Sequence, residues 1–210
     1  MILTLTLNPA VEKMVLVPDL QLGQIRRVDN SDIDPAGKGI NASRVVARLG
    51  WPTIAFSFLA GEVGSLVASA LAAEGVRSSF VRVPGEARLN VTVFDRASRT
   101  ATAFIETGPE IGPEQLQALE ADLKPWLTAR RVLVLAGNVP RGVPDEVYAC
   151  YVRLANEAQA LAIVDADGEP WRRACRRLRC GNWPDHSLSA WTRWSDRHYL
   201  SRYASWARTA

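Results

Sequence analysis

The feature that most constrains the fold is an alternation of strand-like and helix-like segments along the first 168 residues. The strand-like segments are short, apolar and followed by turn residues, whereas the helix-like segments carry apolar residues at helical spacing. Strands that alternate with helices form a parallel sheet whose two faces are covered by those helices. We therefore expect an α/β fold for residues 1–168.

Most of the expected elements fit this pattern. Strands are expected at residues 2–7, 53–59, 79–83, 131–136 and 161–165, and helices at residues 41–49, 65–73, 113–127 and 144–160. In the first helix, Val45, Val46 and Leu49 share one face. Two segments, at residues 14–34 and 88–106, break the pattern, and the second reads as an antiparallel hairpin around residues 95–99. We expect them to form a small second β-sheet.

The composition changes sharply near Gly168. Residues 169–210 hold nine arginines against three acidic residues, a net charge of +6, so the first 168 residues carry −3 of the formal +3. The same segment contains five of the seven tryptophans, both histidines and no lysine. This difference predicts two unlike sequences joined near that glycine.

The remaining composition excludes several classes of protein. No apolar stretch approaches the roughly 20 residues that span a bilayer, and no export signal opens the chain. Cys150, Cys175 and Cys180 form neither a CxxC pair nor an even disulfide framework, and two histidines supply few soft metal ligands. We expect a reduced, cytoplasmic protein without zinc or membrane association.

The most informative single motif is the glycine-rich turn at residues 35–41, Pro-Ala-Gly-Lys-Gly-Ile-Asn. Its backbone amides and the helix that follows can bind an anion or a sugar, and Lys38 adds a positive charge. The spacing is neither that of a Walker A loop nor GxGxxG. Taken alone, the turn is explained at least as well by glycines that provide positive φ before a helix.

The order of the polar motifs along the chain is more specific. The glycine turn lies between Thr6-Leu-Asn-Pro-Ala-Val-Glu12 and Arg88-Leu-Asn90, and further motifs follow at residues 106–109, 136–143 and 164–168. In this order they resemble the PfkB group of ribokinase-like carbohydrate kinases, nearest to 1-phosphofructokinase and tagatose-6-phosphate kinase. The resemblance implies a ribokinase-like parallel sheet with a β-lid at residues 14–34 and 88–106, truncated in its C-terminal half.

The resemblance also assigns substrate-binding positions. It implies that Glu12, where the family has Asp, holds sugar hydroxyls, and that Arg88 binds the substrate phosphate, a role suited to a guanidinium that is always charged. It places the following residues against the sugar: Gly37, Lys38, Gly39, Asn41 and Asn138, the last where the family has Ser.

Other interpretations of individual residues stay open. Arg88 also fits an exposed strand position, and Glu106 fits either a lid or metal-site carboxylate or a solvated strand end. Asp165 and Asp167 end a strand at the carboxyl edge, where open α/β sheets bind ligands. For Asp165, the resemblance favours a structural role.

The activity implied by the resemblance is ATP-dependent phosphorylation of a hexose phosphate, such as fructose 1-phosphate or tagatose 6-phosphate, at a primary hydroxyl, with Mg²⁺. Phosphoryl transfer needs a base, donors for the transferred group and a nucleotide site. The family's Lys-Pro-Asn-x-x-Glu, glycine-rich ATP loop and Gly-Ala-Gly-Asp segments are absent from these 210 residues. We therefore expect no catalytic base and no turnover.

The alternative function is that of a noncatalytic sugar-phosphate binder or of a partner in a homodimer formed through the β-lid.

Our hypothesis for the divergent tail is a shift of reading frame. The family continues Gly-Glu-Ala-Leu-Ala, and deletion of one G from suitable codons for Glu-Ala-Leu-Ala gives Glu-Pro-Trp-Arg, as found at residues 169–172. We expect an out-of-frame segment to pack poorly. A nucleic-acid-binding module rich in arginine and tryptophan is the disfavoured alternative, because no pattern of that class is recognisable there.

Overall fold

The computed structural model describes residues 1–28 and 31–177, which divide into two units. The larger unit comprises Met1–Val11, Asp34–Leu89 and the described residues from Ile105 onward. The smaller unit includes Glu12–Ile33 and Asn90–Phe104. In the described ranges, no helix is both long and apolar enough to cross a membrane.

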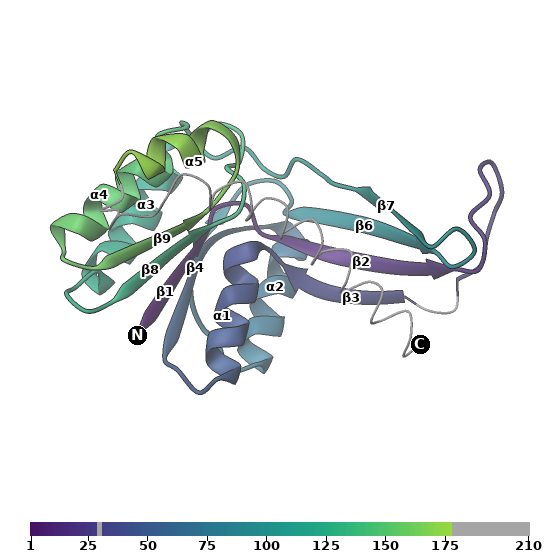
Figure 1. Ribbon diagram of the computed structural model, residues 1–210, viewed down its shortest axis with the longest axis horizontal. Helices are drawn as coiled ribbons and strands as arrows, with labels where there is room; N and C mark the ends of the chain where they lie inside the picture. The colour runs from purple at the N-terminus through teal and green to yellow at the C-terminus, as the bar shows by residue number, and fades with distance from the viewer. Residues whose placement is uncertain (29–30, 178–210) are drawn as a thin grey trace, which may run out of the picture. The chain divides into compact units, whose positions relative to one another are not determined.

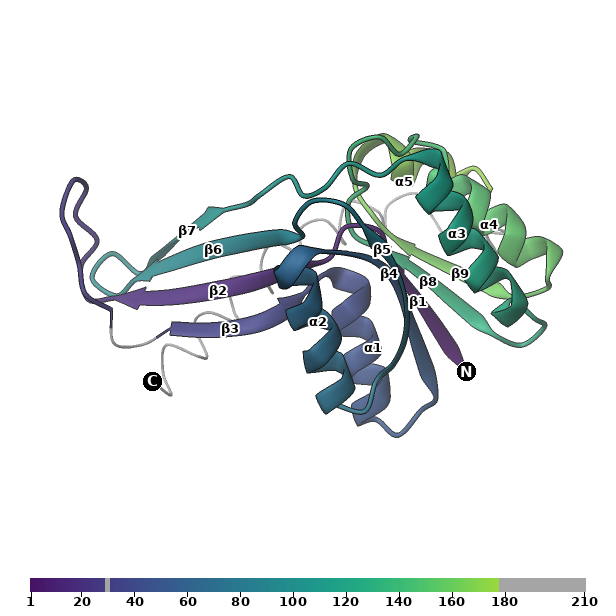
Figure 2. The ribbon, with the colours of Figure 1, turned by 180° about the vertical axis from the view of Figure 1, so that it is seen from behind.

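The larger unit is built on a five-stranded parallel sheet (Figure 1). Its order is β5 (Arg77–Val83), β4 (Thr53–Ala60), β1 (Ile2–Thr6), β8 (Val132–Ala136) and β9 (Leu161–Asp165). One face is covered by α1 (Lys38–Arg48) and α2 (Gly61–Ala73), and the other by α3 (Pro113–Leu123), α4 (Val147–Glu157) and α5 (Gly168–Cys175), as Figure 2 shows from behind. The expected α/β fold is confirmed.

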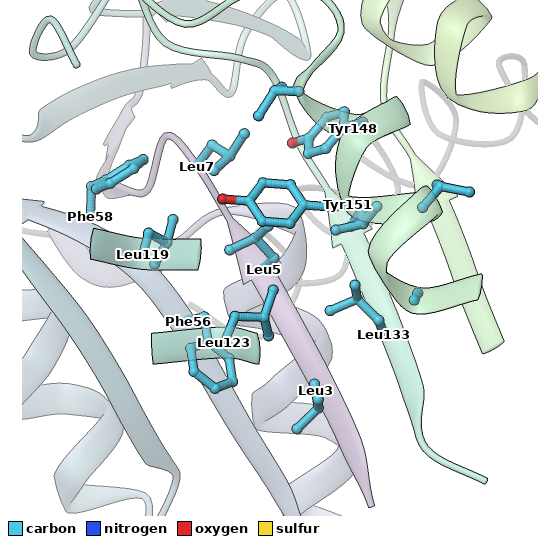
Figure 3. Close-up of a cluster of buried hydrophobic side chains, with 14 of the residues drawn as sticks. Leu3, Leu5, Leu7, Phe56, Phe58, Leu119, Leu123, Leu133, Tyr148 and Tyr151 are labelled. Atoms are coloured by element: carbon cyan, nitrogen blue, oxygen red, sulfur yellow. The ribbon is translucent and has the colours of Figure 1, made fainter. Parts of the chain in front are cut away.

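The alternating sequence of β1 explains how one face of the sheet is filled. Leu3 and Leu5 of β1, and Leu7 just after it, are fully buried and lie in a row (Figure 3). They belong to a large apolar cluster to which α3 and α4 contribute Leu119, Leu123, Tyr148 and Tyr151. Each buried leucine contributes about 2 kcal/mol of transfer free energy, so this face anchors the unit.

The threonines of β1 point to the opposite face, against α1. The hydroxyl of Thr4 lies 2.5 Å from Ser43 Oγ, in the middle of that helix. A Cβ atom on Gly39 would overlap Thr6 Oγ1, so only glycine lets the first turn of α1 lie directly against the end of the strand.

Several predicted boundaries and one predicted face are wrong. Helix α1 begins at Lys38 and buries Ile40 and Arg44, whereas Val45 and Leu49 are more than half exposed. The helix is rotated away from its valine-rich face because the glycine turn and Ser43 fit the threonines of β1.

The other helices differ from the prediction in their boundaries. Helix α2 begins at Gly61, and α3 ends at Leu123, where Lys124–Trp126 form a 3-10 turn that contains a proline. Helix α4 is shorter at both ends than predicted.

The smaller unit is built on a four-stranded sheet. Its order is β3 (Ser31–Ala36), β2 (Ala10–Val17), β6 (Arg88–Asp95) and β7 (Thr100–Phe104). Strands β6 and β7 form the predicted antiparallel hairpin, and Asp95 closes its turn by accepting hydrogen bonds from the Ala97 N–H and the Ser98 hydroxyl. The expected second sheet is confirmed, and its strand β2 begins before the predicted residue 14.

Helix α5 occupies the first residues of the arginine-rich tail. Ala174 is fully buried in the main apolar cluster, and Arg173 pairs with Glu169 and with Glu146, which precedes α4. The expectation of poor packing is therefore wrong for these first residues, because a small side chain fits the interface and two glutamates neutralise the arginine. The tail from residue 178 onward, with its proposed nucleic-acid module, lies outside the described residues.

Candidate functional site

The polar motifs of the larger unit gather at the carboxyl edge of its sheet. Strands β1, β8 and β9 are parallel and in register, so that Leu5 lies opposite Leu135 and Ala136 opposite Asp165. The segments that follow these strands therefore leave the sheet at one edge. Open α/β sheets bind ligands at this edge, where backbone groups of loops and helix N-termini are accessible.

Lys38 crosses this edge to the end of β9. Its Nζ lies 3.1 Å from Asp165 Oδ1 and 3.6 Å from Asp167 Oδ2. The side chains of Lys38 and Asp165 are 37% and 32% exposed, so solvent or a ligand can reach the cluster. The sequence indicated these residues separately, and the structure brings all three together.

The glycine turn is fixed by the strand beneath it. Gly37 has φ of 132°, and a Cβ atom there would lie 3.0 Å from Thr6 Cγ2. Its carbonyl accepts a hydrogen bond from the Asn41 N–H at 2.8 Å, which closes the first turn of α1. Gly37, Gly39 and Asn41 thus form the first turn of α1 beside Lys38, and Gly39 is buried against β1.

Arg88, the first residue of β6, belongs to the larger unit and is buried, with 7% of its surface exposed. Its Nη2 donates a hydrogen bond of 2.5 Å to the carbonyl of Asn8. The interpretation as an exposed strand residue is therefore wrong. A guanidinium held in this way is oriented by the protein before any anion arrives.

Asn138 lies exposed in the loop after β8, and that loop is fixed from both sides. The Gly137 N–H donates to the carbonyl of Asp165 at 2.9 Å, and the Tyr148 hydroxyl donates to the Gly137 carbonyl at 3.0 Å. Burial raises the pKa of Tyr148 well above its ordinary value, with the charge of Asp165 a smaller cause, so the hydroxyl stays a donor. Sequence analysis missed Tyr148; its only signal was a hydroxyl on a helix expected to pack against the sheet.

The two glutamates among the predicted residues have local partners. In the smaller unit, Glu12 Oε1 accepts a hydrogen bond of 3.0 Å from the buried Thr92 hydroxyl. In the larger unit, the exposed Glu106 accepts the Leu89 N–H at 2.8 Å, as a strand-end residue would. Within residues 1–28 and 31–177, no three His, Cys, Asp or Glu side chains are grouped to hold a metal ion. We assign no Mg²⁺ ligand set to the described residues.

Comparison with known proteins decides the family. The sequence model of the pfkB family carbohydrate kinases matches residues 6–181, which include every motif described above. The chain belongs to this family. The match also continues past residue 168, where the composition changes.

Similar proteins agree with this membership. Tagatose-6-phosphate kinase of Staphylococcus epidermidis is 31% identical over 169 residues, 80% of this chain and 54% of that protein. Phosphofructokinase-2 from Escherichia coli in complex with fructose-6-phosphate superposes with a TM-score of 0.77 at 28% identity, covering 84% of this chain and 58% of that one. A possible 1-phosphofructokinase from Thermotoga maritima gives 0.76 at 28% identity, with 83% and 56% covered. The chain spans about half the length of the curated relatives it matches.

Proposed function

We propose that this chain carries the acceptor-binding part of an ATP-dependent kinase that phosphorylates a hexose phosphate of the fructose 1-phosphate or tagatose 6-phosphate type. The observation that carries the proposal is the buried, pre-oriented Arg88 at the carboxyl edge of the sheet. A guanidinium whose paired N–H donors are already held in one orientation binds phosphate with little loss of side-chain entropy. The similarity to a tagatose-6-phosphate kinase and to a phosphofructokinase-2 solved in complex with fructose-6-phosphate supports a sugar phosphate as the ligand class.

The other polar groups would bind the sugar. Lys38 is partly exposed, so a sugar hydroxyl can replace one of its carboxylate contacts at small cost. Backbone groups of the glycine turn can approach a ligand closely because Gly37 and Gly39 carry no side chain. The remaining proposed contacts are Glu12, Asn41 and Asn138.

ATP and Mg²⁺ belong to the reaction proposed for the whole family member, and no step through them is derived from this chain. The described residues offer no metal-ligand group, and the family's base and nucleotide segments are absent from the 210 residues. In our proposal, this chain binds and orients the acceptor and does not turn it over.

Calorimetric titration of the purified chain with fructose 1-phosphate and tagatose 6-phosphate tests the proposal. We expect Arg88→Lys to weaken binding of the preferred hexose phosphate about tenfold, because lysine keeps the charge and loses the fork. The control is Arg153→Lys on the exposed surface of α4, which should change nothing. Equal affinities of the two variants would contradict the role of Arg88.

Turnover is measured separately, as ATP-dependent formation of a hexose bisphosphate. We expect no product above a control without protein. Product that persists after repeated purification, and that Arg88→Lys reduces, would show that the chain is catalytic.

A homodimer through the smaller sheet is a second candidate function. Ile33 on the edge strand β3 is 56% exposed, and Phe104 on the opposite edge strand β7 is 62% exposed. Edge strands with exposed apolar side chains are templates for pairing with another chain. Sedimentation should give a dimer that Ile33→Ser or Phe104→Ser dissociates, whereas Leu22→Ser, at an exposed position outside any strand, should not. A monomeric parent chain would contradict this candidate.

We also propose that the sequence from residue 169 onward reflects a shifted reading frame. The single-base conversion into residues 169–172 and the unlike composition support this origin, whereas the family match through residue 181 argues against a break as early as residue 169. Sequencing of the coding DNA should find Lys-Pro-Asn-like and Gly-Ala-Gly-Asp-like segments in another frame downstream. Their absence from every frame would exclude the explanation.

A further inference from the structure

Asn8, just after β1, lies where three segments of the larger unit meet. Its carbonyl accepts the 2.5 Å hydrogen bond from Arg88 Nη2, at the start of β6. Its side-chain Nδ2 donates to the carbonyl of Thr107, in the loop after β7, at 3.3 Å. Asn8 is 3% exposed. One buried residue therefore ties Arg88 to the end of the central strand and to a distant loop.

Gly108 closes the other side of this arrangement. Its φ is +79°, and a Cβ atom there would lie 2.7 Å from Asn8 Oδ1 and 2.8 Å from Arg88 Cγ. Real Cβ atoms essentially never approach other heavy atoms this closely. The backbone of Gly108 therefore packs directly against the Asn8 amide and the aliphatic part of the Arg88 side chain, and only glycine fits there. The Gly108 carbonyl accepts a 3.2 Å hydrogen bond from Arg141 Nη2, which holds the loop in place.

The amide oxygen of Asn8 adds an independent observation. Oδ1 is buried and has no hydrogen-bond partner, although burial of such an oxygen without a partner is unfavourable. This same oxygen is the atom that a Cβ on Gly108 would meet first. Asn8 is therefore held through its carbonyl, its Nδ2 and its close approach to Gly108, and its Oδ1 contributes no hydrogen bond.

We propose that Asn8 and Gly108 are positioning residues that set the direction of the Arg88 guanidinium for the phosphate of the sugar-phosphate ligand. The identity of the ligand rests on the proposed function, whereas the positioning of Arg88 does not. A displaced guanidinium keeps its charge and loses the fixed fork that recognises phosphate. Phosphate affinity should therefore fall when either residue is changed, although neither needs to touch the ligand.

The test compares Gly108→Ala with Gly75→Ala. Both glycines have positive φ, +79° and +70°, so alanine introduces similar backbone strain at each position. A Cβ atom on Gly75 meets nothing within 4 Å, so only Gly108→Ala adds a steric clash with Asn8 and Arg88. We expect Gly108→Ala to shift the ¹⁵N resonance of Arg88 Nε and to weaken hexose phosphate binding about tenfold more than Gly75→Ala. In the double variant Asn8→Ala/Gly108→Ala, removal of Oδ1 relieves one of the two clashes and should move the Arg88 resonance part of the way back.

The outcomes separate the two proposals. A parent chain that binds neither fructose 1-phosphate nor tagatose 6-phosphate contradicts the proposed function, and the Arg88 resonance alone then tests the positioning. An Arg88 resonance that is the same in the parent chain, Gly108→Ala and Gly75→Ala overturns the positioning. If Gly108→Ala does not fold, Asn8→Ala removes the Thr107 contact without adding an atom. An unshifted Arg88 resonance in that variant also overturns the proposal.

Discussion

Helix α1 contributes a cation to each of two charge clusters that lie in different surroundings. Each contains one cation and two carboxylates. We call them the edge cluster (Lys38, Asp165 and Asp167) and the buried cluster (Arg44, Asp34 and Glu74). The side chain of Lys38 is 37% exposed, whereas that of Arg44 is 10% exposed.

The buried cluster has the geometry of a scaffold. Arg44 donates to Glu74 Oε1 at 2.8 Å through Nε, to Asp34 Oδ2 at 2.8 Å through Nη1, and to the Pro35 carbonyl at 3.3 Å. The hydrogen bonds to Glu74 and then Asp34 raise the pKa of Arg44, and the bond from Arg44 lowers the pKa of Glu74. The edge cluster has longer contacts that are open to solvent. Burial, more than charge, therefore separates a cluster that holds the fold from one that can exchange a partner for a ligand.

Removal of the buried cation should have the largest effect. Arg44→Met leaves Asp34 and Glu74 without their principal partner and should lower the free energy of unfolding by about 3 kcal/mol. The control, Arg48→Met on the same helix, removes a 66% exposed side chain that pairs with Glu74 at 3.2 Å and should cost less than about 1 kcal/mol. Urea denaturation measures both. Equal losses would mean that burial does not distinguish the two arginines.

Part of the loss in Arg44→Met should depend on pH. The pKa of Glu74 is lowered in the folded chain, so its contribution to stability is present above the ordinary pKa of a glutamate, about 4.3, and is lost as the pH falls through the lowered folded value. Unfolding free energies measured from pH 6 downward should therefore decrease less steeply for Arg44→Met than for the parent chain. Parallel curves would contradict the coupling of Glu74 to Arg44.

The edge cluster shows how far the sequence could predict the site. The alternation of strands and helices predicts a parallel sheet, and Asp165 and Asp167 end one of its strands, so a polar cluster at the carboxyl edge follows from the sequence. The pairing of Lys38 with Asp165 does not. It depends on β8 lying between β1 and β9 in the sheet, and the separation of 127 residues leaves no local signal.

The buried cluster shows why the remainder could not be predicted. An arginine within a short helix reads as a surface residue, and the apolar pattern placed the buried face on Val45 and Val46. The burial of Arg44 results from contacts with Asp34 and Glu74, which precede α1 and follow α2. Ile40, four residues before Arg44 and also buried, offered the only local indication of the true face.

A neutral hydrogen bond near the edge should have a smaller effect than the buried ion pairs. Tyr148→Phe removes the donor to the Gly137 carbonyl and should cost about 1 kcal/mol in unfolding free energy. Tyr151→Phe on the same helix is the matched control, because its hydroxyl is also buried and has no hydrogen-bond partner, and its removal should cost nothing or stabilise. If both variants lose the same stability, the bond to Gly137 contributes nothing beyond general packing.

The edge cluster itself should contribute least to stability. Lys38→Met removes contacts of 3.1 and 3.6 Å that are open to solvent, and pairs of this kind contribute about 0 to 1 kcal/mol. The unfolding midpoint should therefore stay close to that of the parent chain, while calorimetric affinity for the hexose phosphate falls. Asp167→Asn, at a 73% exposed side chain, is the control and should change the midpoint no more than Lys38→Met does. A loss as large as that of Arg44→Met would identify the edge cluster as part of the scaffold, because only a cation required by the fold would cost so much to remove despite its exposure.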